Sequence, residues 1–334
     1  MKFLKLLILP CFAVTTTYAS TLPSPSGNQT WQLYYSGSLD GGSLTAFASN
    51  ISGQTFFGTS AGNVYVIDKV NLFTKDNNYT LGGGITALLG GIRKNIYAGT
   101  ANGVLFSQQS PHGDWVKLDL PTPDGGSITS IVDSNENADD IIIGTNAGHV
   151  YGINTQNPVA WKQLGASTVG NGNSIVNLIK PGVGLSASVK GDESVYIYDK
   201  NNNIWNPAGD QSPAVGAIGS IAIAIPNQSI AAGGADNIAL LYKSILMKSW
   251  VWKYLQPAPL DSSATFTSLS TWGSYIYAAT NTGDVFKCDV ANTYQCQALG
   301  DKLAAPVENM SVEGADIFVS LKTVAPAITI YSYK

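Results

Sequence analysis

The feature that most constrains this chain is a phrase that recurs along it. Residues 58–67 read GTSAGNVYVI, residues 99–106 read GTANGVLF and residues 144–153 read GTNAGHVYGI. After the second glycine of each copy a third-strand segment begins, in which the residues alternate in character. Such alternation predicts a half-buried strand. Glycine adopts the positive φ of a tight turn without steric cost. Each copy therefore predicts two strands joined by a tight turn. The turn glycines of the three copies are Gly62, Gly103 and Gly148, and Gly283 takes the same place in a weaker copy later in the chain.

The repeat continues with a regular period. Seven short apolar segments, each predicted to be the first strand of a unit, begin 41 to 48 residues apart, at residues 43, 85, 128, 175, 218, 266 and 307. A second and a third strand can be counted after each of them. This period is typical of propeller blades, each of which is a four-stranded sheet.

The fourth strands explain how the ring closes. Trp115, Trp161 and Trp252 each stand three residues before a leucine and open such a strand, whereas the seventh unit ends at Lys334 without one. The segment WQLYY at 31–35 resembles a fourth strand and precedes the first unit. We expect it to pair with residues 327–333, because closure removes the open edges of a linear array. The sequence predicts an all-β fold, a seven-bladed β-propeller of four-stranded antiparallel blades closed by an N-terminal strand that completes the last blade.

The first 20 residues are predicted to be a secretory signal peptide. Two lysines precede an apolar run, and Thr17-Tyr18-Ala19 gives small residues for cleavage after Ala19 or Ser20. Residues 21–30 are expected to be a flexible lead-in, and residues 31–334 the propeller domain. The mature protein is expected to be a secreted or periplasmic monomer that does not insert into a membrane.

Two cysteines remain after cleavage of the signal peptide. An even count in an exported chain favours a disulfide between Cys288 and Cys296. Cys296 takes the place of the tryptophan that opens other fourth strands, so the bridge would join neighbouring strands with Cα atoms near 5.5–6 Å apart. Two free buried thiols are the alternative.

Charge and motifs exclude several function classes. The net charge is −4, and Arg93 is the only arginine. Nucleic acids and anionic membranes need clustered lysine and arginine, so neither is an expected partner. A sialidase site with three arginines cannot be assembled. The chain has no G-x-S-x-G, HExxH or P-loop motif, so we expect no catalytic residue, metal or cofactor.

The count, the period and the end-to-end closure resemble the seven-bladed β-propellers of the broad WD-repeat-like class. The Trp-Asp dipeptide of true WD repeats is absent, and the Gly148-His149 pair falls at a turn where that family does not place it. The WxxL strands followed by glycine-rich loops are also distantly similar to tectonin-type lectin repeats. Propellers have many unrelated functions, so either resemblance implies the fold rather than an activity.

One pattern suggests a binding surface. Loops that join a fourth strand to the next first strand share a face with the second-to-third turns, and five of these loops carry an aspartate. The five are Asp40, Asp124, Asp210, Asp261 and Asp301. They predict either ordinary turn formers or an acidic rim around the central funnel that binds a protein or a small cationic ligand. His149, at one of the turns, is expected to face solvent.

The sequence leaves two other functions open. A carbohydrate-binding lectin could use the tryptophans, although these rings are better suited to filling the gaps between blades. A glycoside hydrolase or lyase would need a carboxylate pair on the inner strands, and among the glutamates only Glu308 falls on a predicted first strand. Buried tryptophans would argue against the lectin, and a funnel with paired carboxylates would favour the enzyme.

Overall fold

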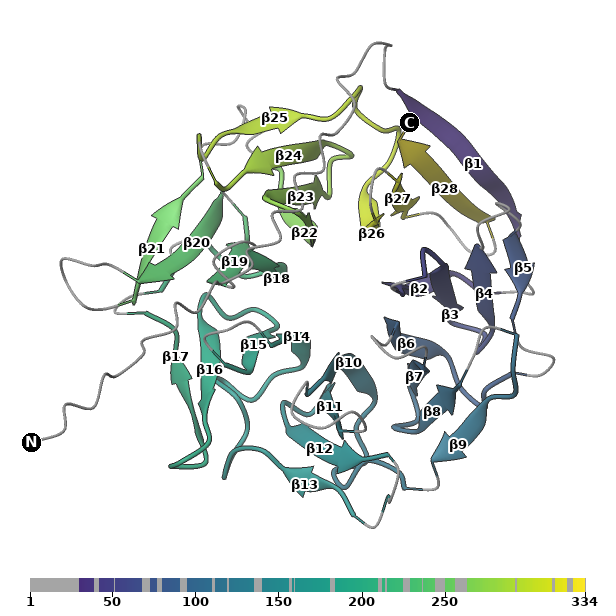
Figure 1. Ribbon diagram of the computed structural model, residues 1–334, viewed down its shortest axis with the longest axis vertical. Helices are drawn as coiled ribbons and strands as arrows, with labels where there is room; N and C mark the ends of the chain where they lie inside the picture. The colour runs from purple at the N-terminus through teal and green to yellow at the C-terminus, as the bar shows by residue number, and fades with distance from the viewer. Residues whose placement is uncertain are drawn as a thin grey trace, which may run out of the picture.

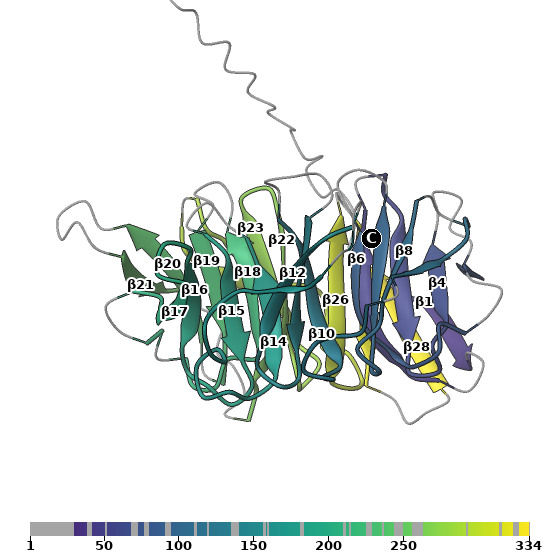
Figure 2. The same cartoon turned by 90° about the horizontal axis from the view of Figure 1, so that it is seen from below.

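Seven sheets of four antiparallel strands surround a common axis (Figure 1). Seen from the side, the ring is a disc whose thickness the strands span (Figure 2). In this computed structural model the described residues are 30–38, 42–50, 52–67, 73–76, 80–90, 95–109, 112–118, 120–134, 140–155, 158, 160–180, 184–209, 212–213, 215–224, 229–235, 237–243, 250–255, 263–291, 293–313, 316–322 and 327–333. The predicted signal peptide lies outside them.

The strands take four positions from the axis outward. The innermost are β2 (Leu44–Ser49), β6 (Ile85–Gly90), β10 (Ile128–Asp133), β14 (Ile175–Ile179), β18 (Ser220–Ala224), β22 (Phe266–Trp272) and β26 (Val307–Glu313). The second strands are β3 (Thr55–Thr59), β7 (Ile96–Thr100), β11 (Asp140–Thr145), β15 (Ser186–Val189), β19 (Ser229–Gly233), β23 (Tyr275–Thr280) and β27 (Asp316–Leu321). The third are β4 (Val64–Ile67), β8 (Leu105–Gln108), β12 (Val150–Asn154), β16 (Val195–Asp199), β20 (Ile238–Lys243), β24 (Val285–Asp289) and β28 (Ala327–Tyr333). The outermost are β5 (Phe73–Lys75), β9 (Val116–Leu118), β13 (Lys162–Gln163), β17 (Ile204–Pro207), β21 (Trp250–Tyr254), β25 (Cys296–Ala298) and β1 (Trp31–Ser38).

The seventh blade confirms the predicted closure. Its strand order is β1-β28-β27-β26, so the first strand of the chain is the outermost strand of the last blade. The register pairs Trp31 with Tyr333 and continues to Ser38 opposite Ala327. The closing strand is therefore longer than the predicted segment 31–35. With this closure the predicted fold class is confirmed.

The Gly-Thr of the recurring phrase joins blades at close range. A Cβ atom on Gly58 would lie 2.4 Å from Cγ2 of Ile85, the first residue of the next blade's inner strand. Two further blade pairs make the same contact, Gly99 with Ile128 and Gly144 with Ile175. The threonine then closes the turn, since the amide of Asn63 donates to Oγ1 of Thr59 at 3.1 Å. Thus glycine is needed for blade packing and threonine for the turn.

The tryptophans of the outermost strands join neighbouring blades. The indole Nε1 of Trp161 donates to the carbonyl of Leu120 in the preceding blade at 3.1 Å. Three other indoles repeat the contact: Trp205 with Leu164, Trp252 with Ala208 and, across the closure, Trp31 with Leu299. These side chains are buried or partly buried, which confirms that they fill the gaps between blades.

The predicted disulfide is confirmed. Cys288 on β24 and Cys296 on β25 lie directly opposite each other and are bonded. Their Cα atoms are 3.9 Å apart, closer than predicted. The reason is the register: the next pair, Asp289 and Gln295, carries a backbone hydrogen bond, so the cysteines occupy a non-hydrogen-bonded position, where opposite Cα atoms are closest. Within the described residues, no helix is long and apolar enough to cross a membrane.

Candidate functional site

The candidate site is the loop face, which we define as the second-to-third turns of the blades together with the loops from each fourth strand to the next first strand. Backbone hydrogen bonds show that the two sets share one face. The amide of Leu81, in such a loop, donates to the carbonyl of the turn glycine Gly62 at 2.9 Å. The contact recurs between Thr122 and Gly103, Val169 and Gly148, and Leu303 and Gly283.

These contacts also explain the turn glycines. All four have the predicted positive φ, which lies between 71° and 92°. A Cβ atom on Gly148 would lie 2.7 Å from the carbonyl oxygen of Gly172 in the facing loop. A side chain there would therefore be strained by the backbone conformation and would also displace the loop.

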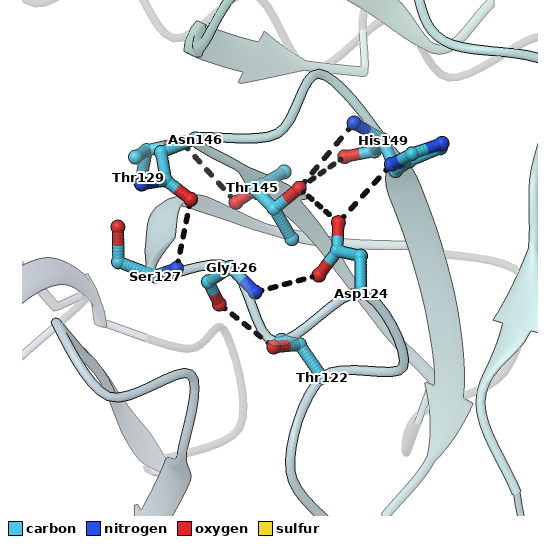
Figure 3. A network of polar contacts seen from close by, with 9 residues as sticks. Thr122, Asp124, Gly126, Ser127, Thr129, Thr145, Asn146 and His149 are labelled. Carbon is cyan, nitrogen blue, oxygen red and sulfur yellow. Dashed lines mark hydrogen bonds and ion pairs between the residues drawn. The ribbon is translucent and has the colours of Figure 1, made fainter.

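Asp124 holds one of these loops to its turn (Figure 3). One carboxylate oxygen accepts the amide of Gly126 at 2.9 Å, and the other accepts the hydroxyl of Thr145 at 2.7 Å. His149 places its Nδ1 atom 3.1 Å from the same carboxylate. The Asp124 side chain is only 9% exposed, so this carboxylate is engaged within the protein.

The prediction that His149 faces solvent holds only in part, because its side chain is 26% exposed and its Nδ1 atom contacts the carboxylate of Asp124. The sequence placed both residues on the loop face, but nothing in it indicated that this loop and this turn would bring them within bonding distance.

Burial raises the pKa of the Asp124 carboxyl, but hydrogen bonds from Thr145, Gly126 and His149 outweigh it and hold the pKa below its usual value. Tyr151, two residues beyond His149, responds in the opposite direction. Burial and the charge of Asp124 raise the pKa of Tyr151 to about 12. The hydrogen bonds to the charged carboxylate of Asp124 thus hold this loop against its turn.

Of the other four aspartates predicted to form the rim, the structure describes only one. Asp301 is exposed in the loop before β26, with no hydrogen bond among those of the described residues. Asp40, Asp210 and Asp261 lie outside the described residues. The described part of the loop face therefore brings Asp124 and Asp301 to one face but gives them different environments.

Other charged side chains on the loop face make it acidic. Its exposed and partly exposed carboxylates, in the described residues, belong to Asp124, Asp192, Glu193, Asp284 and Asp301, together with Glu308 at the start of β26. Its ammonium groups belong to Lys190, Lys302 and Lys322. Two of these charges neutralise each other, because Lys302 lies 3.1 Å from Asp284. The balance of six carboxylates to three ammonium groups in the described residues leaves this face with a negative charge.

Glu308 lies on β26, the innermost strand of the seventh blade. Its side chain is accessible to solvent, yet desolvation by the surrounding protein raises its pKa, and the charge of Lys322 opposes part of that rise. The neighbouring charge that affects the pKa of Glu308 is thus that of the Lys322 ammonium group. The paired carboxylates that a glycosidase needs are a different arrangement.

Asp76 is a polar centre that the sequence did not indicate. It follows β5, and its carboxylate is fully buried between the first and second blades. It accepts the side-chain amide of Gln108 at 2.8 Å, the indole of Trp115 at 3.2 Å and the backbone amide of His112 at 2.8 Å. Here a carboxylate replaces the backbone carbonyl that other tryptophans use. Among the described residues, no group of three histidine, cysteine, aspartate or glutamate side chains could hold a metal ion.

Comparison with known proteins identifies the fold. No family model and no curated protein matches this chain. The chain is similar to YCF48 from Cyanidioschyzon merolae, with 12% identity, a TM-score of 0.67 and coverage of 91% of this chain and 98% of that one. It is similar to a catalytically inactive virginiamycin B lyase from Staphylococcus aureus bound to quinupristin, with 12% identity, a TM-score of 0.71 and coverage of 90% and 99%.

A third similar structure is a chain of the mitotic checkpoint complex, with 13% identity, a TM-score of 0.66 and coverage of 97% of this chain and 98% of that one. At such identities the likeness shows a shared propeller fold. The three neighbours include a lyase and a member of a protein assembly, so the fold does not choose between catalysis and binding. The likeness to tectonin-type repeats stays a prediction.

Proposed function

We propose that this protein is an exported, non-enzymatic binding module that engages a protein or a cationic ligand through its loop face. The observation that carries the proposal is the excess of carboxylates on that face, with Glu193, Asp301 and Glu308 exposed. Like charges gathered on one surface create a field that attracts cationic partners and speeds their encounter.

The structure changes the part that Asp124 has in this proposal. Because its carboxylate is engaged by three groups, it serves to hold the loop in place, and the partner contacts fall to exposed residues such as Glu193 and Asp301. Asp40, Asp210 and Asp261 remain proposed members of the rim from the sequence. Export is supported by the disulfide, which persists in oxidising compartments.

The two alternatives have less support. A lectin that stacks sugars on the tryptophans of the outermost strands would need free rings, whereas Trp161, Trp205 and Trp252 donate their indole hydrogens to the neighbouring blade. A hydrolase or lyase would rest on Glu308 and its raised pKa, and its chemistry would need a second carboxylate nearby.

The test reverses charge on one face at a time. The loop-face variant carries Glu193→Lys and Asp301→Lys, and the matched control carries Asp114→Lys and Asp316→Lys. Asp114 lies in the connection before β9 and Asp316 is the first residue of β27, so both are exposed at the opposite ends of the blades, and both variants change the net charge by the same amount. Each mature protein is immobilised and used to capture partners from an extract of the source cells, and binding of a labelled hexalysine peptide is measured by fluorescence anisotropy.

We expect the loop-face variant to lose the captured partner and to bind hexalysine at least tenfold more weakly, while the control stays within twofold of the unchanged protein. If only the control variant loses binding, the functional face is the opposite one. If both variants bind as the unchanged protein does, the exposed carboxylates have no part in recognition and the proposal fails.

A further inference from the structure

A cavity of about 490 Å³ lies between the third and fourth blades. It is lined by residues at the end of β10, the start of β11, the end of β12 and the start of β13, and from the fourth blade by the end of β14, the start of β15 and the end of β16. These are the ends of the blades opposite the loop face. Its volume falls within the range of small-molecule sites, which is roughly 300–1,000 Å³.

One repeat lacks a side chain at this cavity. Gly152 lines it and stands four residues after the turn glycine Gly148, on the third strand of its blade. The residues at the same distance from the turn glycine in other blades are Val66, Ser107 and Lys287. The atom nearest to a Cβ built on Gly152 is Cδ1 of Leu164 at 3.8 Å, so nothing in the backbone or packing demands glycine here. The glycine therefore leaves space at a position where these other blades carry a side chain.

The floor of the cavity is apolar and its rim is basic. The register places Ile142 and Lys162 directly beside Gly152 on the two flanking strands, so these residues share one side of the sheet. Leu164 and Leu185 add apolar surface, and Tyr198 adds an aromatic ring.

Lys162, Lys180 and Lys200 all line the cavity. They are three of only 18 basic residues in a chain whose net charge is −4, and they come from both blades. Lys180 and Lys200 also have interactions within the chain. The nearby carboxylate of Asp199 is directed into its own turn, where it accepts hydrogen bonds from Asn201 and Asn202.

We propose that this cavity is a second binding site, which takes a small organic anion with an apolar body, such as a medium-chain carboxylate. The apolar floor accommodates the body of the ligand, and the three ammonium groups attract its anionic head. The site goes beyond the loop-face function and has the opposite charge preference, so either can fail without the other.

The probes are 8-anilinonaphthalene-1-sulfonate and its uncharged analogue N-phenyl-1-naphthylamine, whose fluorescence rises on entering an apolar site. The first variant is Gly152→Val, which restores the side chain found at Val66. The second is Lys162→Gln with Lys200→Gln, and its matched control is Lys75→Gln with Lys117→Gln, two exposed lysines of other blades. Circular dichroism and the melting temperature show that each variant is folded.

We expect one site at which the sulfonate binds at least tenfold more tightly than the uncharged analogue. The Lys162 and Lys200 variant should weaken sulfonate binding at least fivefold and leave the uncharged probe within twofold, whereas the control should change neither. Gly152→Val should remove binding of both probes, and sodium decanoate should displace the sulfonate where 1-decanol does not.

Equal sulfonate binding by the Lys162 and Lys200 variant and by its control would overturn the proposal, whatever the glycine variant does. Unchanged binding by a folded Gly152→Val protein would place the probe elsewhere and would also overturn it. If the glycine variant does not fold, the comparison of the two lysine variants decides alone.

Discussion

Replacing Asp76 with alanine removes the acceptor at the centre of the contact between the first two blades. Gln108 keeps the carbonyl of Gly113, at 2.8 Å, as an acceptor, but the hydrogen bonds of the His112 amide and the Trp115 indole to the carboxylate are lost. A hydrogen bond to a charged group contributes roughly 1.5–3 kcal/mol. The loss of two such bonds, counted without full additivity, predicts a loss of about 2–4 kcal/mol, which corresponds to a melting temperature lower by roughly 3–6 °C for a domain of this size.

The assay is thermal unfolding followed by circular dichroism at one fixed scan rate, with Asp114→Ala as the control. Asp114 is an exposed carboxylate two residues after His112, and its loss should change stability by less than about 0.5 kcal/mol. Asp76→Asn keeps one acceptor oxygen and should fall between the two. If Asp76→Ala melts with Asp114→Ala, the buried carboxylate does not join the blades as argued.

Three further predictions address the loop face and the disulfide. Gly148→Ala should lower the melting temperature by several degrees at the same scan rate, because alanine is strained at a φ of 80° and its Cβ would meet the facing loop; an unchanged value would contradict this. Replacing Cys288 and Cys296 with alanine should cost about 2.5 kcal/mol on the chain-entropy model for so short a loop, measured by urea unfolding. Tyr151 should ionise near pH 12 and so contribute stability that is present below its unfolded pKa near 10 and lost as the pH rises towards 12; Asp124→Asn should lower that pKa, which NMR of labelled tyrosine can follow.

The repeat made the architecture predictable, because each part of its phrase has a local cause. Gly62 is needed for the turn, Gly58 for the approach of the next blade and Thr59 for closing the turn. The period then set the number of blades, and the missing fourth strand of the last unit identified residues 31–35 as the closing strand. Local and periodic signals of this kind are visible in a single sequence.

The site was less predictable, because its contacts join residues from different repeats. Asp124 and His149 are 25 positions apart, and Asp76 meets Trp115 across 39 positions. The sequence of a loop does not indicate whether its aspartate is hydrogen-bonded within the protein or exposed to solvent. That depends on how the ring brings different repeats together. Gly152 is the exception, since a glycine at a repeat position that otherwise carries a side chain was visible in the sequence, although its consequence was not.

Hydrogen–deuterium exchange can show whether partners bind at the loop face. It is measured on the mature protein with and without the partner that is cross-linked to it in living cells. Exchange read by mass spectrometry locates the covered backbone without any substitution. We expect slower exchange at residues 190–194 and 299–306, which carry Glu193 and Asp301, and unchanged exchange at residues 112–115 and 199–203 at the opposite ends of the blades. Protection confined to the latter two segments would contradict binding at the loop face.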